Sequence, residues 1–127
     1  MTPRKRKPSA VKNECTRLHS LIVRSRGYCE HCGDAWRANG SKLECAHIVS
    51  RRYSRTRTLE ANAFCLCSRD HIRFTEWPLE FAAFVVSKIG EAEYARLKAL
   101  ANSTEKVDWE AELTRLRAVW LEIERAA

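Results

Sequence analysis

The chain carries the segments CEHC (residues 29–32), ECAHI (44–48) and CLCSRDH (65–71), with a single Asn62 between the last two. Two cysteines separated by two residues bind a soft divalent metal ion, because both thiolates reach the ion from one side. The first segment has this spacing, and the last repeats it with an aspartate in place of the second cysteine. Matched spacings on two distant segments predict one ion that joins them.

The expected ion is a structural Zn²⁺ held by Cys29, Cys32 and Cys67. Asp70 stands where a fourth cysteine would stand, and a carboxylate oxygen is an accepted though less common zinc ligand. Cys65 is the alternative, since residues two apart on a strand point to the same side. The fourth ligand therefore stays open between Asp70 and Cys65.

Two histidines and an asparagine are interleaved with these cysteines. An imidazole with a pKa near neutrality takes a proton from water, and His47 is our candidate for this general base. Phosphodiester attack also requires a cation at the scissile phosphate, and we expect His71 to be its ligand. Asn62 is expected to orient the connecting loop or the His47 backbone. Each residue alone has an ordinary structural explanation, so the combination carries the hypothesis.

The charge distribution predicts a polyanionic partner. The formal net charge is +7, and RKRK at residues 4–7 opens the chain. Four more arginines lie between the candidate base and Asn62, and we expect them to contact DNA phosphates on both sides of the cut. These are Arg51, Arg52, Arg55 and Arg57. A solvated basic loop is the alternative interpretation.

The chain has six cysteines, and its basic, polar start does not resemble a secretory signal. No apolar stretch approaches the length of a membrane span. We therefore expect an intracellular, reducing compartment, where clustered cysteines favour metal binding over disulfides.

The N-terminal part is expected to form a disordered basic arm over residues 1–8 and a domain over 9–77. Ser9 is the predicted cap of the first helix, and Gly27 its stop. Asn39-Gly40 is a turn signal. A short strand is then expected at residues 42–49, a second one in the following loop or around 64–66, and a helix over 67–74.

Helices are expected over 78–90 and 91–101, and a last one from Ser103 or Thr104. They form a helical extension, 78–127, packed on the core. The last helix carries an apolar stripe, which predicts packing against earlier helices; a surface for a protein partner is the alternative. The stripe consists of Trp109, Leu113, Leu116, Trp120 and Ile123. The predicted fold class is α+β, mostly helical, with a small zinc-stapled ββα core.

Residues 28–75 resemble the HNH endonuclease family, whose zinc-stapled members combine these cysteine pairs with an ordered His, Asn and His. The AHIxxR phrase (46–51) and the NAFCLC run (62–67) look most like phage-associated members, including the NinG-type recombination proteins of lambda-like phages. The resemblance implies a ββα-metal fold and DNA hydrolysis with Mg²⁺ or Mn²⁺. It also implies His47 as general base, Asn62 as the loop-orienting residue and His71 as ligand of the catalytic ion.

Two positions depart from the family pattern. Asp70 replaces the last zinc-site cysteine, and Ala46 stands where many relatives carry a metal ligand. Glu44 lies on the same strand face as residue 46 and is expected to help hold the catalytic ion. The alternatives are a non-catalytic DNA-binding module and an interaction adaptor that uses the last helix. A phage or prophage origin places the protein in the bacterial cytoplasm; a homodimer or a phage protein partner stays open.

Overall fold

The computed structural model describes residues 7–35 and 42–127. The chain is α+β and mostly helical, as predicted. Most of the predicted N-terminal arm and the Asn39-Gly40 turn signal lie outside the described residues. The elements are α1 (Pro8–Arg24), β1 (Leu43–His47), the one-turn 3-10 helix η1 (Glu60–Asn62), β2 (Ala63–Cys67), α2 (Ser68–Glu76), α3 (Pro78–Ile89), α4 (Glu91–Ala101) and α5 (Trp109–Ala126).

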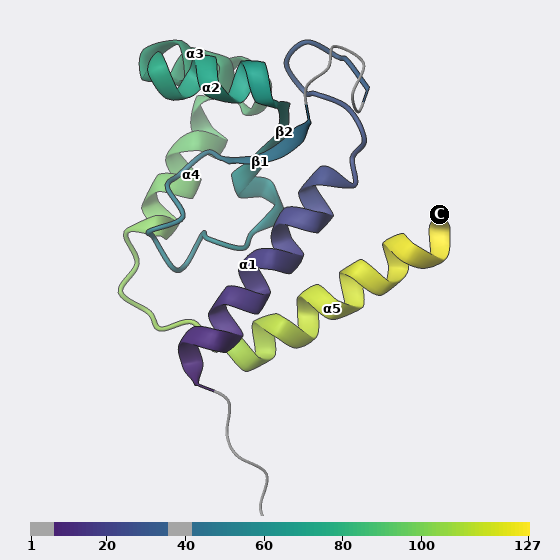
Figure 1. Cartoon of the computed structure of the whole chain (residues 1–127). Coiled ribbons are helices and arrows are strands. Elements are labelled where there is room, and N and C mark those ends of the chain that lie inside the picture. The colour runs from purple at the N-terminus through teal and green to yellow at the C-terminus, as the bar shows by residue number, and fades with distance from the viewer. Residues whose placement is uncertain (1–6, 36–41) are drawn as a thin grey trace, which may run out of the picture.

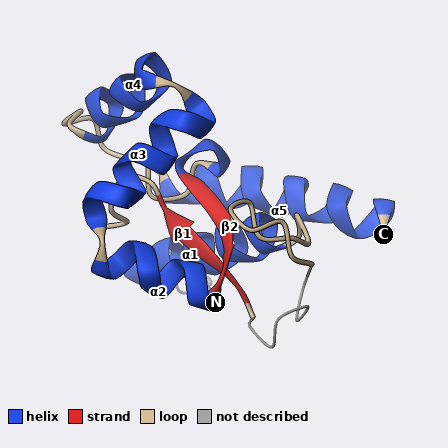
Figure 2. Ribbon diagram, turned by 90° about the horizontal axis from the view of Figure 1, so that it is seen from above, coloured by secondary structure: helices blue, strands red, loops and turns tan. Residues whose placement is uncertain are grey.

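The two strands pair in an antiparallel sheet, and α2 follows β2 without a linker (Figure 2). The register places Leu43 opposite Cys67 at one end and His47 opposite Ala63 at the other. Every residue of β2 is buried, because both α1 and α2 contact the sheet. Both predicted strands are therefore present, and the sheet brings the cysteine segment and the candidate base to its two ends.

One hydrophobic core joins the sheet to α2, α3 and α4. Its centre is aromatic: the rings of Phe74 and Phe84 stack with centroids 5.1 Å apart, and Phe64 lies 5.0 Å from Phe84. Val85 and Leu97 are fully buried beside them. The predicted packing of the helices after residue 78 on the core is thus present for α3 and α4.

A second core joins α1 to α5, which meet in the lower half of Figure 1. Leu113 and Leu116 of the α5 stripe are buried against α1. Trp109, Trp120 and Ile123 are partly buried against the same core, so the stripe packs within the chain, as expected. The α1 residues of this core are Val11, Cys15, Leu18 and Ile22.

Two predicted helix starts are wrong. The first helix begins at Pro8 with Lys7 as its N-cap, so Ser9 lies inside it and caps nothing. Proline suits this first helical position because its missing N–H would have no partner there. The last helix begins at Trp109, where the Asp108 carboxylate accepts the Ala111 N–H at 3.1 Å. Ser103 and Thr104 belong to the preceding linker instead.

Within residues 7–35 and 42–127, no helix combines the length and apolar character needed to span a membrane.

Candidate metal centre and catalytic cleft

Four side chains converge at the end of the sheet that carries Cys67. Cys29 and Cys32 lie in the turn after α1, Cys67 ends β2, and Asp70 lies in the first turn of α2. Their ligand atoms are all within 4.8 Å of one another. Cys32 Sγ is 4.0 Å from Cys67 Sγ, close to the separation of about 3.8 Å that two Zn–S bonds of about 2.3 Å give in a tetrahedron. The group is compatible with a structural zinc ion.

Local backbone geometry explains the placement of the first two cysteines. The Gly33 N–H donates to the Cys29 carbonyl at 2.8 Å, and the Cys29 N–H donates to the Asp34 carbonyl at 2.8 Å. Gly33 has φ of +81°, a left-handed conformation that a residue with a Cβ adopts only at a cost. The glycine therefore closes the turn immediately after Cys32.

Of the two candidates for the fourth ligand, Asp70 lies with the three cysteines and Cys65 does not. Asp70 Oδ2 accepts from Cys29 Sγ at 3.3 Å and lies 3.0 Å from His31 Nδ1. Burial opposes ionisation of this carboxyl, but hydrogen bonds from His31 and the thiols outweigh it and hold the Asp70 pKa below its usual range. A carboxylate is the form that binds zinc.

Cys65 is fully buried and lies outside this group. It lies opposite Cys45 in the sheet, two residues before the end of β2. Its backbone N–H donates to Glu30 Oε2 at 2.6 Å, and its carbonyl accepts the Glu30 N–H at 2.7 Å. Cys65 therefore anchors the turn that carries Cys29 and Cys32 to β2 through its backbone, and the geometry favours Asp70 as the fourth member of the group.

His47 lies at the other end of the sheet, at the edge of a cleft of about 640 Å³. His47 Nε2 is 2.8 Å from the Arg57 carbonyl oxygen, which only accepts hydrogen bonds. The Nε2 atom must therefore carry the proton, and Nδ1 keeps a lone pair. Burial lowers the pKa of His47 below its usual value, which favours the neutral imidazole.

Asn62 is fully buried and fastens the loop that follows β1. Its Oδ1 accepts the Val49 N–H at 2.9 Å, and its Nδ2 donates to the carbonyls of Val49 and Thr56, each at 3.0 Å. The Asn62 carbonyl also accepts the Ile48 N–H at 2.8 Å. These bonds hold the residues directly after His47, the arrangement expected of a loop-orienting side chain.

His71 projects from α2 into the same cleft as His47. Its Nδ1 lies 2.8 Å from Glu44 Oε1, so this nitrogen donates a proton to the carboxylate, and in the neutral ring Nε2 carries the lone pair. Histidines that bind metals commonly donate their other N–H to a carboxylate in this way. The predicted helper Glu44 thus contacts the predicted ligand His71 and orients it.

The four predicted phosphate-binding arginines have different surroundings. Arg51 lines the cleft and, like Arg52, is exposed. The Arg57 guanidinium is hydrogen-bonded within the chain: its Nε donates to Thr16 Oγ1 at 2.8 Å and its Nη1 to the Arg51 carbonyl at 3.0 Å. Arg55 forms an ion pair with Glu105 at 3.5 Å. The structure therefore brings only Arg51 of these four into the lining of the cleft.

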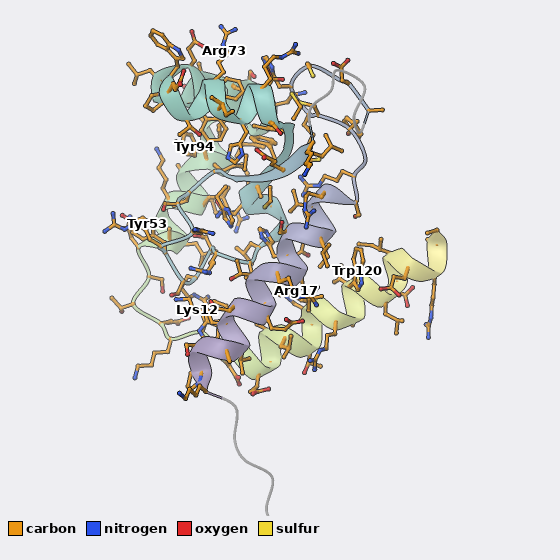
Figure 3. All side chains as sticks on the ribbon, in the orientation of Figure 1. Lys12, Arg17, Tyr53, Arg73, Tyr94 and Trp120 are labelled. Atoms are coloured by element: carbon orange, nitrogen blue, oxygen red, sulfur yellow. The ribbon has the colours of Figure 1, made fainter. Side chains whose placement is uncertain are left out.

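The loop that carries these arginines also reaches α1. Lys12 of α1 and Tyr53 of the loop lie on the same side of the molecule in Figure 3, and Lys12 Nζ donates to Ser54 Oγ at 3.3 Å. Arg52 lies over the Tyr53 ring, 5.8 Å from its centroid. This side of the loop is basic and adjoins the cleft through Arg51.

Two residues near the base had no role in the sequence interpretation. His19 of α1 is fully buried, and its ring centroid lies 5.1 Å from that of His47. Cys45 of β1 lines the cleft, and its Sγ lies 3.8 Å from His19 Nδ1. Cys45 is detectable from the sequence, since it stands two residues before His47 on one strand and so shares its face. His19 follows directly on the buried Leu18 in α1, and no local signal links it to the strand.

No family model, curated protein or solved structure matches this chain. The interpretation of the site therefore rests on its own geometry.

Proposed function

We propose that this chain is a zinc-stapled nuclease of the HNH type that hydrolyses DNA phosphodiester bonds. The observation that carries the proposal is that His47 and His71 line one cleft. In each neutral ring, one nitrogen is hydrogen-bonded and the other carries a lone pair. A general base and a metal ligand both require such a nitrogen.

In the proposed reaction, His47 Nδ1 takes a proton from a water molecule in the cleft. The water oxygen attacks phosphorus, and one P–O bond of the phosphodiester breaks as its oxygen leaves with the electron pair. The Arg57 carbonyl keeps the imidazole in the required tautomer throughout. Asn62 holds the backbone after His47, so the base is positioned before substrate arrives.

His71 Nε2 would hold Mg²⁺ or Mn²⁺, which supplies Lewis-acid stabilisation of the leaving oxygen when bound. The donor set suits an ion that is held weakly, because His71 contributes one nitrogen and Glu44 is engaged with the same ring. Mg²⁺ commonly keeps several waters and takes substrate phosphate oxygens as ligands. Arg51 at the rim of the cleft would neutralise a phosphate beside the cut.

A second candidate function is a non-catalytic DNA-binding module. The observation that favours it is Ala46, which is 2% exposed and fills with a methyl group the position where related nucleases carry a ligand. With one nitrogen donor at the site, DNA binding through the basic surface would outlast the loss of hydrolysis.

Supercoiled plasmid separates the two candidates. The zinc-containing protein is incubated with plasmid in the presence and absence of added Mg²⁺ or Mn²⁺, without a chelator, so that the structural ion stays in place. Binding to a fluorescent duplex is measured in parallel at several salt concentrations. Nicking that depends on added metal supports the nuclease. Salt-sensitive binding without nicking under any metal supports the binding module, and the absence of both contradicts both.

A further inference from the structure

A second group of metal-ligating side chains lies beside the cleft, apart from the cysteine cluster. It consists of His19 from α1 with Cys45 and His47 from β1, and one ligand atom of each lies within 4.8 Å of the other two. Cys45 and His47 line the cleft, whereas His19 is fully buried behind them. The group shares no residue with the cluster of Cys29, Cys32, Cys67 and Asp70.

Both histidines present the same nitrogen. His19 Nε2 lies 2.9 Å from the Leu59 carbonyl oxygen, as His47 Nε2 lies 2.8 Å from that of Arg57. Each carbonyl requires a protonated Nε2, so each Nδ1 keeps its lone pair. A backbone carbonyl that accepts the second N–H of an imidazole is a common arrangement around bound metals, because it fixes the ring and its tautomer.

The separations suit a tetrahedral ion. Bonds of about 2.3 Å to sulfur and about 2.05 Å to nitrogen place those two ligand atoms about 3.6 Å apart at a tetrahedral angle. His19 Nδ1 and Cys45 Sγ are 3.8 Å apart.

We propose that His19, Cys45 and His47 form a second metal site, specific for a thiophilic divalent cation of the Zn²⁺ class. Three protein ligands leave one coordination position, which faces the cleft through Cys45 and His47. A thiol and two imidazoles discriminate against Mg²⁺ and Mn²⁺, which prefer oxygen ligands. The ion would enter through the cleft, and the fully buried His19 would hold it from the inner side.

The site has a consequence for catalysis that rests on the proposed nuclease function. An ion bound to His47 Nδ1 occupies the lone pair that would accept a proton from water. Zn²⁺ at this site and general-base catalysis by His47 are therefore mutually exclusive. Zinc at the cysteine cluster would support activity, while zinc at the second site would inhibit it.

The test counts metal in the full-length protein and does not depend on activity. Protein equilibrated with Zn²⁺ in excess Mg²⁺ is analysed for bound zinc, and Co²⁺ loading gives thiolate-to-metal charge-transfer absorption. Wild type is expected to bind two ions, and Cys45→Ala one, with loss of the absorption due to a single thiolate. Cys15→Ala is the matched control, because this buried thiol lies outside both groups, and it is expected to bind two.

His47→Ala is the second variant, for use if Cys45→Ala does not fold, since His47 is only half-buried. It is expected to lower the affinity for the second ion by more than about tenfold. One zinc ion per wild-type chain would overturn the proposal. So would two zinc ions in Cys45→Ala together with an unchanged affinity for the second ion in His47→Ala. For the catalytic consequence, zinc is expected to inhibit Mg²⁺-dependent nicking by wild type. If wild type binds two ions but never nicks DNA, the nuclease proposal fails and the metal site stands.

Discussion

The two ends of the small sheet differ in how their polar atoms are used. At the Leu43–Cys67 end, three thiols and the Asp70 carboxylate face one another across distances that one ion would bridge. His47, at the other end, and His71 from α2 face one cleft, and each has one ring nitrogen hydrogen-bonded to a carbonyl or a carboxylate. A complete set of metal ligands stabilises a fold. An imidazole ring with only one nitrogen hydrogen-bonded can still bind a substrate or an ion through the other.

On the proposed function, this difference would let so small a sheet support chemistry. Metal binding contributes directly to folding where the ligands converge only in the native state. The cysteine cluster joins the turn after α1, the end of β2 and the start of α2, so one ion would fix three segments at once. The rigidity gained at that end positions His71, which lies on α2 one residue after Asp70.

The largest expected effect is that of zinc removal from the cysteine cluster. Structural zinc sites in small domains contribute roughly 10 kcal/mol or more of apparent binding free energy, which is comparable to the whole stability of a domain. A strong chelator is therefore expected to unfold the sheet and α2, measured by circular dichroism and near-UV signals. Cys67→Ser is expected to have the same effect without a chelator. A chelated protein with unchanged spectra would contradict the structural role of the ion.

Asn62→Ala is expected to have the next largest effect, at the cleft end. Its loss leaves three backbone groups of Val49 and Thr56 without their side-chain partner, at a cost of about 3 kcal/mol in the free energy of unfolding. Urea denaturation measures it. Asn102→Ala is the control, because this exposed amide makes one bond to a helix carbonyl and its loss should cost less than about 0.5 kcal/mol. Equal effects of the two substitutions would show that Asn62 does not fasten the loop.

Glu112 makes the stability of the cleft end depend on pH. Its carboxylate accepts from Thr58 Oγ1 at 2.5 Å, next to the residue that bonds His47, and from Arg115. Burial raises the Glu112 pKa, but the hydrogen bonds from Arg115 and Thr58 outweigh it, and the net pKa lies below its usual value of 4.5. A depressed pKa contributes stability that is present above pH 4.5 and is lost as the pH falls through the folded-state value.

Glu112→Gln is therefore expected to be less stable than wild type by about 1–2 kcal/mol at pH 7. The difference should shrink as the pH falls below 4.5, and thermal unfolding at several pH values measures it. Glu122→Gln, on the exposed part of α5, is the matched control with little expected effect. If the stability difference between wild type and Glu112→Gln instead grew as the pH fell, the predicted lowering of the Glu112 pKa would be contradicted.

The smallest predicted effect concerns DNA binding. Arg51→Ala is expected to weaken binding to all duplex sequences alike and to reduce the slope of log K against log salt by about 1, because one phosphate contact is lost. Fluorescence anisotropy over a salt series measures both quantities. Arg125→Ala removes the same charge at the end of α5, and its salt slope should match that of wild type. If Arg51→Ala and Arg125→Ala had the same slope of log K against log salt, DNA would not contact Arg51.

Most elements could be predicted because their signals are local. Pro78 and Gly90 bracket α3, and Gly90 has φ of +84°, the conformation for which glycine is favoured. The strands follow from short apolar runs around the two motif segments. The start of α5 was misplaced because Ser103, Thr104 and Asp108 all suit a helix cap, and only the third is followed by the packed stripe.

The candidate site could be predicted only where its residues belong to a motif. The cysteine spacing led to the cluster, but the selection of Asp70 over Cys65 depends on the end of β2 and the first turn of α2. Arg57 resembles a solvated charge in the sequence, yet the loop folds back so that it reaches Thr16 on α1. His19 contacts His47 across 28 positions of chain, a pairing set by the packing of α1 on the sheet and carried by no local pattern.

The central claim is that the free Nδ1 of His47 activates water, and the nicking rate of His47→Ala tests it most directly. Wild type, His47→Ala and Arg125→Ala are compared on supercoiled plasmid with Mg²⁺, after one zinc ion per chain and equal thermal unfolding have been established for all three. The account predicts metal-dependent nicking by wild type and Arg125→Ala, and a loss of at least about 100-fold in His47→Ala, as expected for removal of a general base. Nicking by His47→Ala at the wild-type rate would contradict it.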